Sequence, residues 1–294
     1  MPELPDLTIY RDALAERIRA QRLERVRILN PFVLRTAVPP IADAEGRTVV
    51  DVRRLGKRIV IALPGELFLI IHLMIAGRLR WLDRGAKPPG RITLAVFEFA
   101  TGALAFTEAG SKRRASLHCV LGGAAVKAFD AGGLEVFAIE AATFSTRITS
   151  ENHTLKRALT DPRLLAGIGN AYSDEILHRA RLSPLALTQK LSADELARLF
   201  AATRAVLAEW TERLQAQTNG GFPENVTAFR PEMTVHGRFG KPCPVCGAPV
   251  QRIVYAENEC NYCARCQTKG VVLADRALSR LLHKSWPRSI DELG

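Results

Sequence analysis

Apolar positions near the N-terminus recur at the spacing of one face of a helix. They are Leu7, Ile9, Leu14, Ile18 and Leu23. Pro5 precedes them, and proline suits the first turn of a helix because no amide donor is required there. The spacing and the proline together predict an amphipathic helix that continues to about Arg22.

The pattern changes to short strands between residues 26 and 121. Apolar and β-branched residues gather in short runs there, and Gly, Pro, Asp and Glu separate the runs. The predicted strands are Val49 to Val52, Arg58 to Leu63, Leu67 to Leu73, Arg78 to Leu82, Arg91 to Phe99 and Ala103 to Thr107. Strands at this density indicate a sandwich or a barrel.

Helical spacing returns from about Ser150 to Gln217. The longest predicted helix runs from Ala193 to Leu214, and Ser192 can cap it while the Glu195 side chain reaches back to the cap. The segment 219–223, Asn-Gly-Gly-Phe-Pro, then ends the helical region. A strand-rich region is therefore expected to precede a helical one.

A glycine-rich loop separates two of the shorter helical patterns. Gly167 and Gly169 allow the backbone to turn sharply and to approach a phosphate closely. Asn170 could donate from its side chain, beside amides at the start of the next helix. A plain tight turn explains the same two glycines, so the loop alone does not establish a binding site.

Paired cysteines near the C-terminus change the picture. Cys243 and Cys246 form one Cys-x-x-Cys pair, Cys263 and Cys266 form another, and sixteen residues separate the pairs. Without a secretion signal this spacing favours a metal over disulfides. Four thiolates give tetrahedral zinc a closed, structural site, and a segment this short needs the metal in order to fold. Cys260 is a spare; exchanging it with Cys263 is possible but breaks the two-residue spacing.

Charge narrows the class of partner. The net charge is +11 and the sequence pI is about 9.8, which favours a polyanion, nucleic acid before membrane. No run approaches 18 uninterrupted apolar residues, so no membrane span is predicted. Aromatic residues make up 6% of the chain, which disfavours a single-strand binder built on base stacking.

The first residues carry candidate chemistry. Removal of Met1 would free the secondary amine of Pro2, which could attack a sugar carbon and form an iminium that withdraws electrons. Glu3, next to it, could act as acid or base. The positive end of the following helix dipole disfavours the ammonium form of the amine. The competing interpretation is a frayed N-terminus followed by an ordinary helix cap.

Four motifs occur together in one known family. They are Pro2-Glu3-Leu4-Pro5, Gly56-Lys57-Arg58, the segment from Gly167 to Glu175, and His236-Gly237-Arg238 before the cysteines. The chain resembles formamidopyrimidine-DNA glycosylase and its relative endonuclease VIII over about residues 2 to 267. The Pro-Glu-Leu-Pro start favours the formamidopyrimidine branch.

The resemblance implies an α+β multidomain fold. An N-terminal helix and β-sandwich would form a catalytic domain at 1–133, and a helix–two-turn–helix DNA-binding domain would span 134–240. A four-cysteine zinc finger with one structural Zn²⁺ would occupy 241–270, and 271–294 would be a C-terminal extension. Leu278, Leu281 and Leu282 predict a short helix in that extension that packs on the protein.

The implied function is a DNA-repair glycosylase with AP lyase activity that removes oxidised or ring-opened bases. Pro2 would attack C1′ and form a Schiff base, and Glu3 would protonate or stabilise the opening sugar. Lys57 would contact a phosphate and assist elimination, while Asn170 would hold backbone phosphates. The damaged base would be flipped out of double-stranded DNA. A monomer in a bacterial-type cytoplasm, associated with the nucleoid, is expected.

Several positions depart from the family pattern. Ile75 stands where the family has a Met that fills the gap left by the flipped base, and Met74 would face the other side of a strand. Arg114 is kept, but Ala115 replaces an aromatic wedge. Asn258 replaces an arginine that holds phosphate, which removes about one ionic contact.

Asp6 stands where the family has Glu, with a shorter reach. These departures leave two alternatives open. One is a non-catalytic protein that binds damaged DNA on the same scaffold. The other is a glycosylase for oxidised pyrimidines or another lesion.

Overall fold

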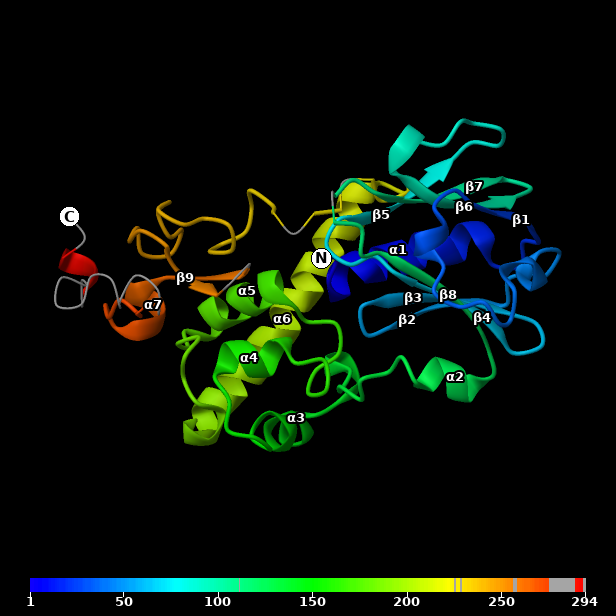
Figure 1. Ribbon diagram of the computed structural model, residues 1–294. Helices are drawn as coiled ribbons and strands as arrows, with labels where there is room; N and C mark the ends of the chain where they lie inside the picture. The colour runs from blue at the N-terminus through cyan, green and yellow to red at the C-terminus, as the bar shows by residue number, and fades with distance from the viewer. Residues whose placement is uncertain (111, 225, 228, 256–257, 275–288, 293–294) are drawn as a thin grey trace. The chain divides into compact units, whose positions relative to one another are not determined.

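The computed structural model describes residues 1–110, 112–224, 226–227, 229–255, 258–274 and 289–292, with the backbone alone at 255 and 258. The chain divides into two compact units (Figure 1). One unit comprises Met1–Ala131 together with Trp210–Thr227, and the other comprises Gly132–Glu209 together with Ala228–Gly294. Each unit has a buried apolar interior of its own.

Helix α1 opens the first unit and spans Leu4–Ile18. Pro5 lies in its first turn, as predicted. The helix ends earlier than predicted, because Ala20 adopts the left-handed conformation with φ +62°. Leu23 therefore begins strand β1, Leu23–Ile28, instead of continuing the apolar face of the helix.

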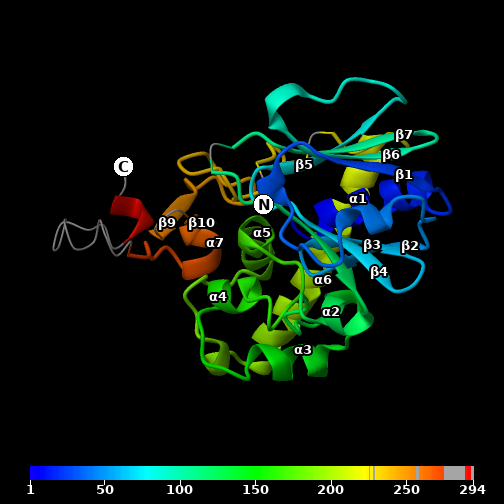
Figure 2. The same cartoon turned by 45° about the vertical axis from the view of Figure 1, so that its right-hand side comes forward.

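Two antiparallel four-stranded sheets follow, and Figures 1 and 2 show them as two layers with α1 alongside. The strand orders are β1-β6-β7-β5 and β2-β3-β4-β8. The bounds after β1 are β2 Asp51–Leu55, β3 Arg58–Leu63, β4 Leu67–His72, β5 Gly77–Leu82, β6 Thr93–Phe99, β7 Gly102–Glu108 and β8 Ser116–Leu121. Nearly every side chain of β3, β6 and β7 is buried, so the strand-rich prediction and its sandwich interpretation are confirmed.

The strand ends differ from the sequence-based expectation. A short 3-10 turn at Gly90–Ile92 delays the start of β6 to Thr93. β4 ends at His72, one residue before the predicted end. β1 and β8 were not predicted individually, because short edge strands with mixed burial lack a clear period-two pattern.

The end of the long helix α6, Ala193–Thr218, belongs to the first unit together with the segment that follows it. The Phe222 ring lies 5.8 Å from the ring of Tyr10 on α1 and 6.4 Å from that of Trp81 on β5. Arg17 lies over the same ring, 5.6 Å from its centroid. Aromatic packing on α1 and β5 therefore holds the segment around Phe222, which follows the end of α6.

Helices dominate the second unit, as predicted. Those before residue 228 are α3 Ala141–Ile148, α4 Leu155–Thr160, α5 Asn170–Ala180 and the first part of α6. The short helix α2, Gly123–Lys127, belongs to the first unit. The predicted cap of α6 is confirmed, since the Ser192 amide donates to the Glu195 carboxylate at 3.0 Å. The Glu195 amide donates to the Ser192 hydroxyl at 3.2 Å, which completes the capping box.

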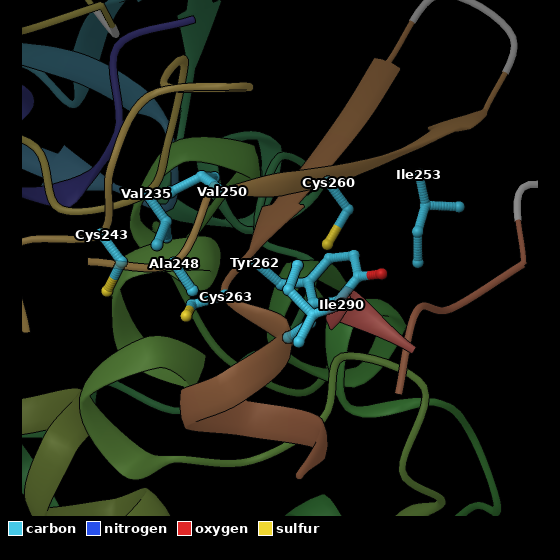
Figure 3. Close-up of a cluster of buried hydrophobic side chains, with 10 residues drawn as sticks. Val235, Cys243, Ala248, Val250, Ile253, Cys260, Tyr262, Cys263 and Ile290 are labelled. Carbon is cyan, nitrogen blue, oxygen red and sulfur yellow. The ribbon is translucent and has the colours of Figure 1, made fainter. Parts of the chain in front are cut away.

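A β-hairpin and a short helix close the second unit (Figure 2). They are β9 Gln251–Tyr255, β10 Asn258–Tyr262 and α7 Ala264–Thr268. Figure 3 shows the small core that they share with the preceding loop. This core consists of Val235, Cys243, Ala248, Val250, Ile253, Cys260, Tyr262, Cys263, Ala264 and Ile290.

The C-terminal extension contributes to that core. Ile290, in a 3-10 turn spanning Ile290–Glu292, is buried there, and its amide donates to the Gly270 carbonyl at 2.8 Å. This part of the extension therefore packs on the hairpin core. The helix predicted around Leu278, Leu281 and Leu282 lies outside the described residues. Within the described part of the chain, no helix is long and apolar enough to span a membrane.

Candidate active site and metal centre

The start of α1 holds a buried pair of carboxylates. Glu3, only 2% exposed, is the N-cap residue, and its carboxylate accepts a hydrogen bond from the Asp6 amide. The Glu3 amide in turn donates to the Asp6 carboxylate at 3.0 Å. This reciprocal cap fixes the Glu3 side chain directly beside Pro2, which is itself buried. The shorter Asp6 side chain still reaches its partner.

Charges gather around the N-terminal amine. The amine in the structure is that of Met1, which lies one residue before the Pro2 nitrogen that removal of Met1 would expose. Burial is the main cause that lowers the pKa of this amine. Glu3 and Asp6 oppose the shift, whereas Arg78 and Lys57 add to it. The structure thus brings Pro2, Glu3 and Lys57 into one electrostatic neighbourhood.

Lys57 is presented by the tight turn between β2 and β3. Leu55 and Arg58 pair across the turn, and Gly56 adopts φ +56°, which favours glycine. Arg54 donates to the Gly56 carbonyl at 2.7 Å and so braces the turn. The position of the Lys57 backbone is therefore set by the strand register.

His72 lies at the end of β4, directly opposite Arg58. Burial, and then the charges of Arg58, Lys57 and His118, lower the pKa of His72 to about 4, so the imidazole is neutral at pH 7. Sequence reasoning missed both His72 and Arg78 as neighbours of the site. The sequence offered one signal for His72, which is a polar residue at the end of an otherwise apolar strand. No sequence feature distinguished Arg78 from the other arginines.

Ile75 projects from a turn, and the strand expected for Met74 is absent there. After β4 ends at His72, Met74 takes the left-handed conformation at φ +52°, so its predicted position on the opposite face of a strand is wrong. Ile75 is 59% exposed. Arg78 donates to the carbonyls of Ile75, at 3.1 Å, and of Gly77, at 2.7 Å, which holds the turn.

A second loop lies beside this turn. Gly77 and Glu108 pair at the ends of β5 and β7, and a Cβ added to Gly110 would lie 3.3 Å from that of Ala76. The Arg114 side chain is exposed, whereas Ala115 is 3% exposed. The buried Glu108 carboxylate accepts the amides of both, at 3.0 and 3.2 Å. Position 115 therefore faces the interior and offers no wedge.

Asn170 begins α5, as the glycine-rich loop predicted. Its side-chain amide donates to the Glu259 carbonyl on β10 at 2.8 Å. Asn258, the predicted partner in phosphate binding, starts the same strand opposite Tyr255, but its side chain lies outside the described residues. The structure thus places the loop of Asn170 against the strand that carries Asn258.

A buried ionic network supports this loop. Lys156 donates to the Asn170 carbonyl at 2.7 Å and to the Asp174 carboxylate at 2.6 Å. The second oxygen of Asp174 lies 2.8 Å from Nδ1 of His236 and accepts the Asn261 amide at 3.1 Å. Every partner of this buried carboxylate is a donor or a cation, so the network fixes α5 relative to β10.

The structure brings the predicted cysteine ligands together in two close pairs. The Sγ atoms of Cys243 and Cys266 lie 4.0 Å apart, and those of Cys246 and Cys263 lie 3.4 Å apart. Zinc–sulfur bonds of about 2.3 Å in a tetrahedron place sulfurs roughly 3.8 Å apart, so the thiols fit zinc. The ligand atoms that all lie within 4.8 Å of one another are those of His178, Cys243, Cys263 and Cys266. His178 lies on α5, and its Nε2 is 3.4 Å from Cys243 Sγ. Sequence reasoning missed His178, which is distant in the chain.

Cys260 is a core residue. It is 1% exposed, lies beside Tyr262 and away from Cys243 in Figure 3, and belongs to the apolar cluster of the hairpin. Burial raises the pKa of its thiol well above the usual value. Cys263, and not Cys260, belongs to the group of possible metal ligands among the described residues, so an exchange of Cys260 with Cys263 is not supported.

Three known domain families match this chain. The formamidopyrimidine-DNA glycosylase N-terminal domain matches residues 1–114, and the H2TH domain of the same enzyme matches residues 134–219. The zinc finger found in FPG and IleRS matches residues 240–269. A formamidopyrimidine-DNA glycosylase of Thermus thermophilus is 35% identical over 286 residues, which cover 92% of this chain and 100% of the relative. The chain belongs to the formamidopyrimidine-DNA glycosylase family.

Solved structures agree with this assignment. The crystal structure of MutM (Fpg) from Thermus thermophilus is 34% identical, with a TM-score of 0.77, and the match covers 90% of this chain and 98% of that one. The Lactococcus lactis Fpg bound to DNA containing FAPY-dG gives a TM-score of 0.80 at 23% identity, covering 90% and 100%. The second likeness shows the shared fold.

Membership of the formamidopyrimidine-DNA glycosylase family confirms the predicted class of function. The protein is a DNA-repair glycosylase for damaged bases, of a family in which AP lyase activity is typical. Its cofactor is structural zinc, held in the cysteine-rich finger. The zinc stabilises the fold of the finger. It takes no part in bond breaking, because a closed tetrahedral site leaves no coordination position for a substrate.

Proposed function

We propose that the protein removes ring-opened or oxidised bases from double-stranded DNA through the amine of Pro2. The observation that supports this most directly is the grouping of Glu3, Lys57 and Arg78 charges around a buried N-terminal amine whose pKa is lowered. A low pKa leaves more of the amine unprotonated at neutral pH, and only the unprotonated form is nucleophilic. DNA as substrate would place the protein at a bacterial nucleoid.

The proposed chemistry uses each of these groups in turn. After Met1 is removed, the uncharged Pro2 nitrogen bonds to C1′, and the glycosidic bond breaks with its electron pair leaving on the base, which takes up the proton that the nitrogen gives up. The bond from C1′ to the ring oxygen then opens, Glu3 supplies the proton that this oxygen needs, and the nitrogen lone pair forms the iminium. A C2′ proton is lost to water, the C3′–O bond breaks with its electron pair leaving on the 3′ phosphate, and Lys57 neutralises charge on the phosphates there.

The DNA contacts are proposed from exposure and position. Exposed Ile75, on a turn held by Arg78, would fill part of the gap left by the flipped base, and exposed Arg114 would enter beside it. Asn170 and Asn258 would hold backbone phosphates through neutral donors. We propose the four cysteines Cys243, Cys246, Cys263 and Cys266 as the zinc ligands, and a monomer as the active form.

Ring-opened purine is the leading lesion, because the relatives are named formamidopyrimidine-DNA glycosylases and the Lactococcus lactis structure holds FAPY-dG. Burial of Ala115 favours a second candidate, a shifted preference towards oxidised pyrimidines or another lesion. Without an aromatic side chain at this position the protein is less able to unstack a base pair. Lesions that already weaken base pairing should therefore be better substrates than lesions that pair normally.

Borohydride trapping tests the chemistry separately from lesion choice. Incubation of the protein with duplex DNA carrying an abasic site, plus borohydride, should give a covalent adduct at Pro2, located by mass spectrometry. Acetylation of the N-terminus should abolish the adduct, and intact mass should show that Met1 is absent. No adduct from protein that lacks Met1 would leave a DNA-binding protein without catalysis as the better description.

Glu3→Gln separates the two chemical steps. Glutamine keeps an oxygen that can accept the Asp6 amide, so the cap of α1 survives. The variant should lose base excision more than cleavage of a ready-made abasic site, because the proton from Glu3 serves sugar opening. Excision of FAPY-dG, 8-oxoguanine and an oxidised pyrimidine, measured in parallel, would rank the lesions.

A further inference from the structure

One face of helix α5 holds the zinc-finger region along its length. Asn170, Asp174 and His178 recur every four residues and therefore share a face of the helix. Asn170 binds the Glu259 carbonyl, Asp174 accepts the Asn261 amide, and His178 approaches Cys243. Figures 1 and 2 show α5 beside the hairpin and α7.

Glu175 adds backbone contacts on the same helix. Its carboxylate accepts the amides of Thr234, Val235 and His236 at 2.8 to 3.0 Å, directly before the first zinc knuckle. The segment that leads into Cys243 is thus held by α5 through three donors. The finger and α5 form one buried polar assembly, and His178 is its contact with the metal centre.

The contact of His178 has the geometry of a hydrogen bond to sulfur. Nε2 lies 3.4 Å from the Cys243 Sγ, and both side chains are buried. A zinc-bound thiolate accepts and cannot donate, so Nε2 must carry the proton in the loaded finger. His178, Cys243, Cys263 and Cys266 have their ligand atoms within 4.8 Å of one another, and Cys246 Sγ lies 3.4 Å from Cys263 Sγ. If the two Cys-x-x-Cys pairs supply all four ligands of structural zinc, as proposed above, the imidazole lies outside the ligand set.

The other thiolates receive donors from within the finger. Cys263 Sγ accepts the Cys266 amide at 3.5 Å, and Cys246 accepts the Ala248 amide. Cys243 receives its donor from a helix more than sixty residues earlier in the chain. Removing this donor therefore loosens the link between α5 and the metal without removing a ligand.

We propose that His178 is an outer-shell hydrogen-bond donor to the zinc-bound thiolate of Cys243 and couples zinc retention to helix α5. Donation to a thiolate spreads the negative charge of a four-thiolate site and disfavours attack by protons or chelators. The proposal rests on the structural zinc of the finger and is independent of the proposed catalytic residues.

Zinc release from the full-length protein tests the proposal. Zinc-loaded His178→Leu and His178→Met should release metal to an excess of chromophoric chelator roughly 10–100-fold faster than wild type, the range typical of lost outer-shell partners. His178→Gln, which keeps a side-chain donor, should lie closer to wild type. His153→Leu is the matched control, because His153 pairs with Glu151 and its loss should leave the release rate unchanged.

Cobalt substitution separates a donor from a ligand. Cobalt-loaded wild type and His178→Leu should give the same four-thiolate spectrum. Equal zinc release from wild type and both non-donor variants would overturn the proposal, as would a glutamine variant no better than leucine. A wild-type cobalt spectrum with a nitrogen ligand that is lost in His178→Leu would also overturn it, because His178 would then replace Cys246 in the ligand set.

Discussion

At the scale of single residues, the pKa of the N-terminal amine depends on neighbours from the start of α1, the β2–β3 turn and β5. Burial lowers its pKa most, Glu3 opposes this shift, and Arg78 and Lys57 reinforce it. The two cations act in the same direction as desolvation, so all three favour the unprotonated form of this amine. Arg78 has a second role, because its guanidinium also donates hydrogen bonds to the carbonyls of Ile75 and Gly77 in the turn.

Arg78→Met should move the pH dependence of borohydride trapping. The variant loses a cation that lowers the amine pKa, so that pKa rises and the rate of trapping should reach its half-maximum at a higher pH. Trapping rates on a ready-made abasic duplex across a pH series would measure the shift. Arg78→Lys keeps the charge and should stay near the wild-type profile; a shift of equal size in the lysine variant would contradict an electrostatic cause.

Position 115 is decided by packing. Ala115 is buried, and its amide is held by the Glu108 carboxylate. Ala115→Phe should therefore lower stability by about 1–3 kcal/mol through overpacking, and it should not restore the family's aromatic wedge. Thermal unfolding and excision assays would test both halves of this expectation. Improved excision without loss of stability would show that the side chain can point outwards.

At the scale of elements, the zinc finger is held by its metal and by a small apolar core. Cys260 and Cys263 are both buried in that core, but of the two only Cys263 also belongs to the group of possible metal ligands among the described residues. Cys260 lies within β10, whereas Cys263 follows the end of the strand at Tyr262 and is the N-cap residue of α7, which explains how two close cysteines take different roles.

Exchanging each of these cysteines for serine should separate the roles. Cys260→Ser should keep about one zinc per chain and lower the melting temperature modestly, because a hydroxyl enters an apolar core. Cys263→Ser should lose zinc and unfold the finger, since a thiolate ligand is missing. The zinc content per chain, measured on both purified variants, distinguishes the two roles. Loss of zinc in the Cys260 variant alone would show that Cys260, and not Cys263, is the ligand.

At the scale of the whole molecule, the net charge of +11 suits a polyanionic partner. Affinity for duplex DNA should fall steeply with salt, because each phosphate contact releases counterions. Asn258→Arg should tighten binding and steepen the slope of log affinity against log salt by about one unit, if position 258 faces a phosphate. Titrations at several salt concentrations would show this. Asn152→Arg, at an exposed site in the same unit, controls for added charge alone.

The sequence by itself determined the features that depend on local pattern. Pro5 at the start of α1, the Ser192–Glu195 cap and the paired cysteines were all predictable, because each signal lies within a few residues of its partner. The sandwich was predictable as a class from the density of strands. The order of domains and the enzyme family followed from the resemblance of the motifs; the domain boundaries and the roles of individual site residues remain predictions.

The tertiary structure decided which distant residues meet. Strand register places His72 opposite Arg58, and the end of β4 makes Met74 and Ile75 a turn. Burial of Ala115 depends on a carboxylate from β7, and the approach of His178 to Cys243 depends on how α5 packs against the finger. The pairing of His72 with Arg58, the burial of Ala115 and the approach of His178 to Cys243 depend on partner segments, so the surroundings of these side chains could not be read from their own neighbours in the sequence.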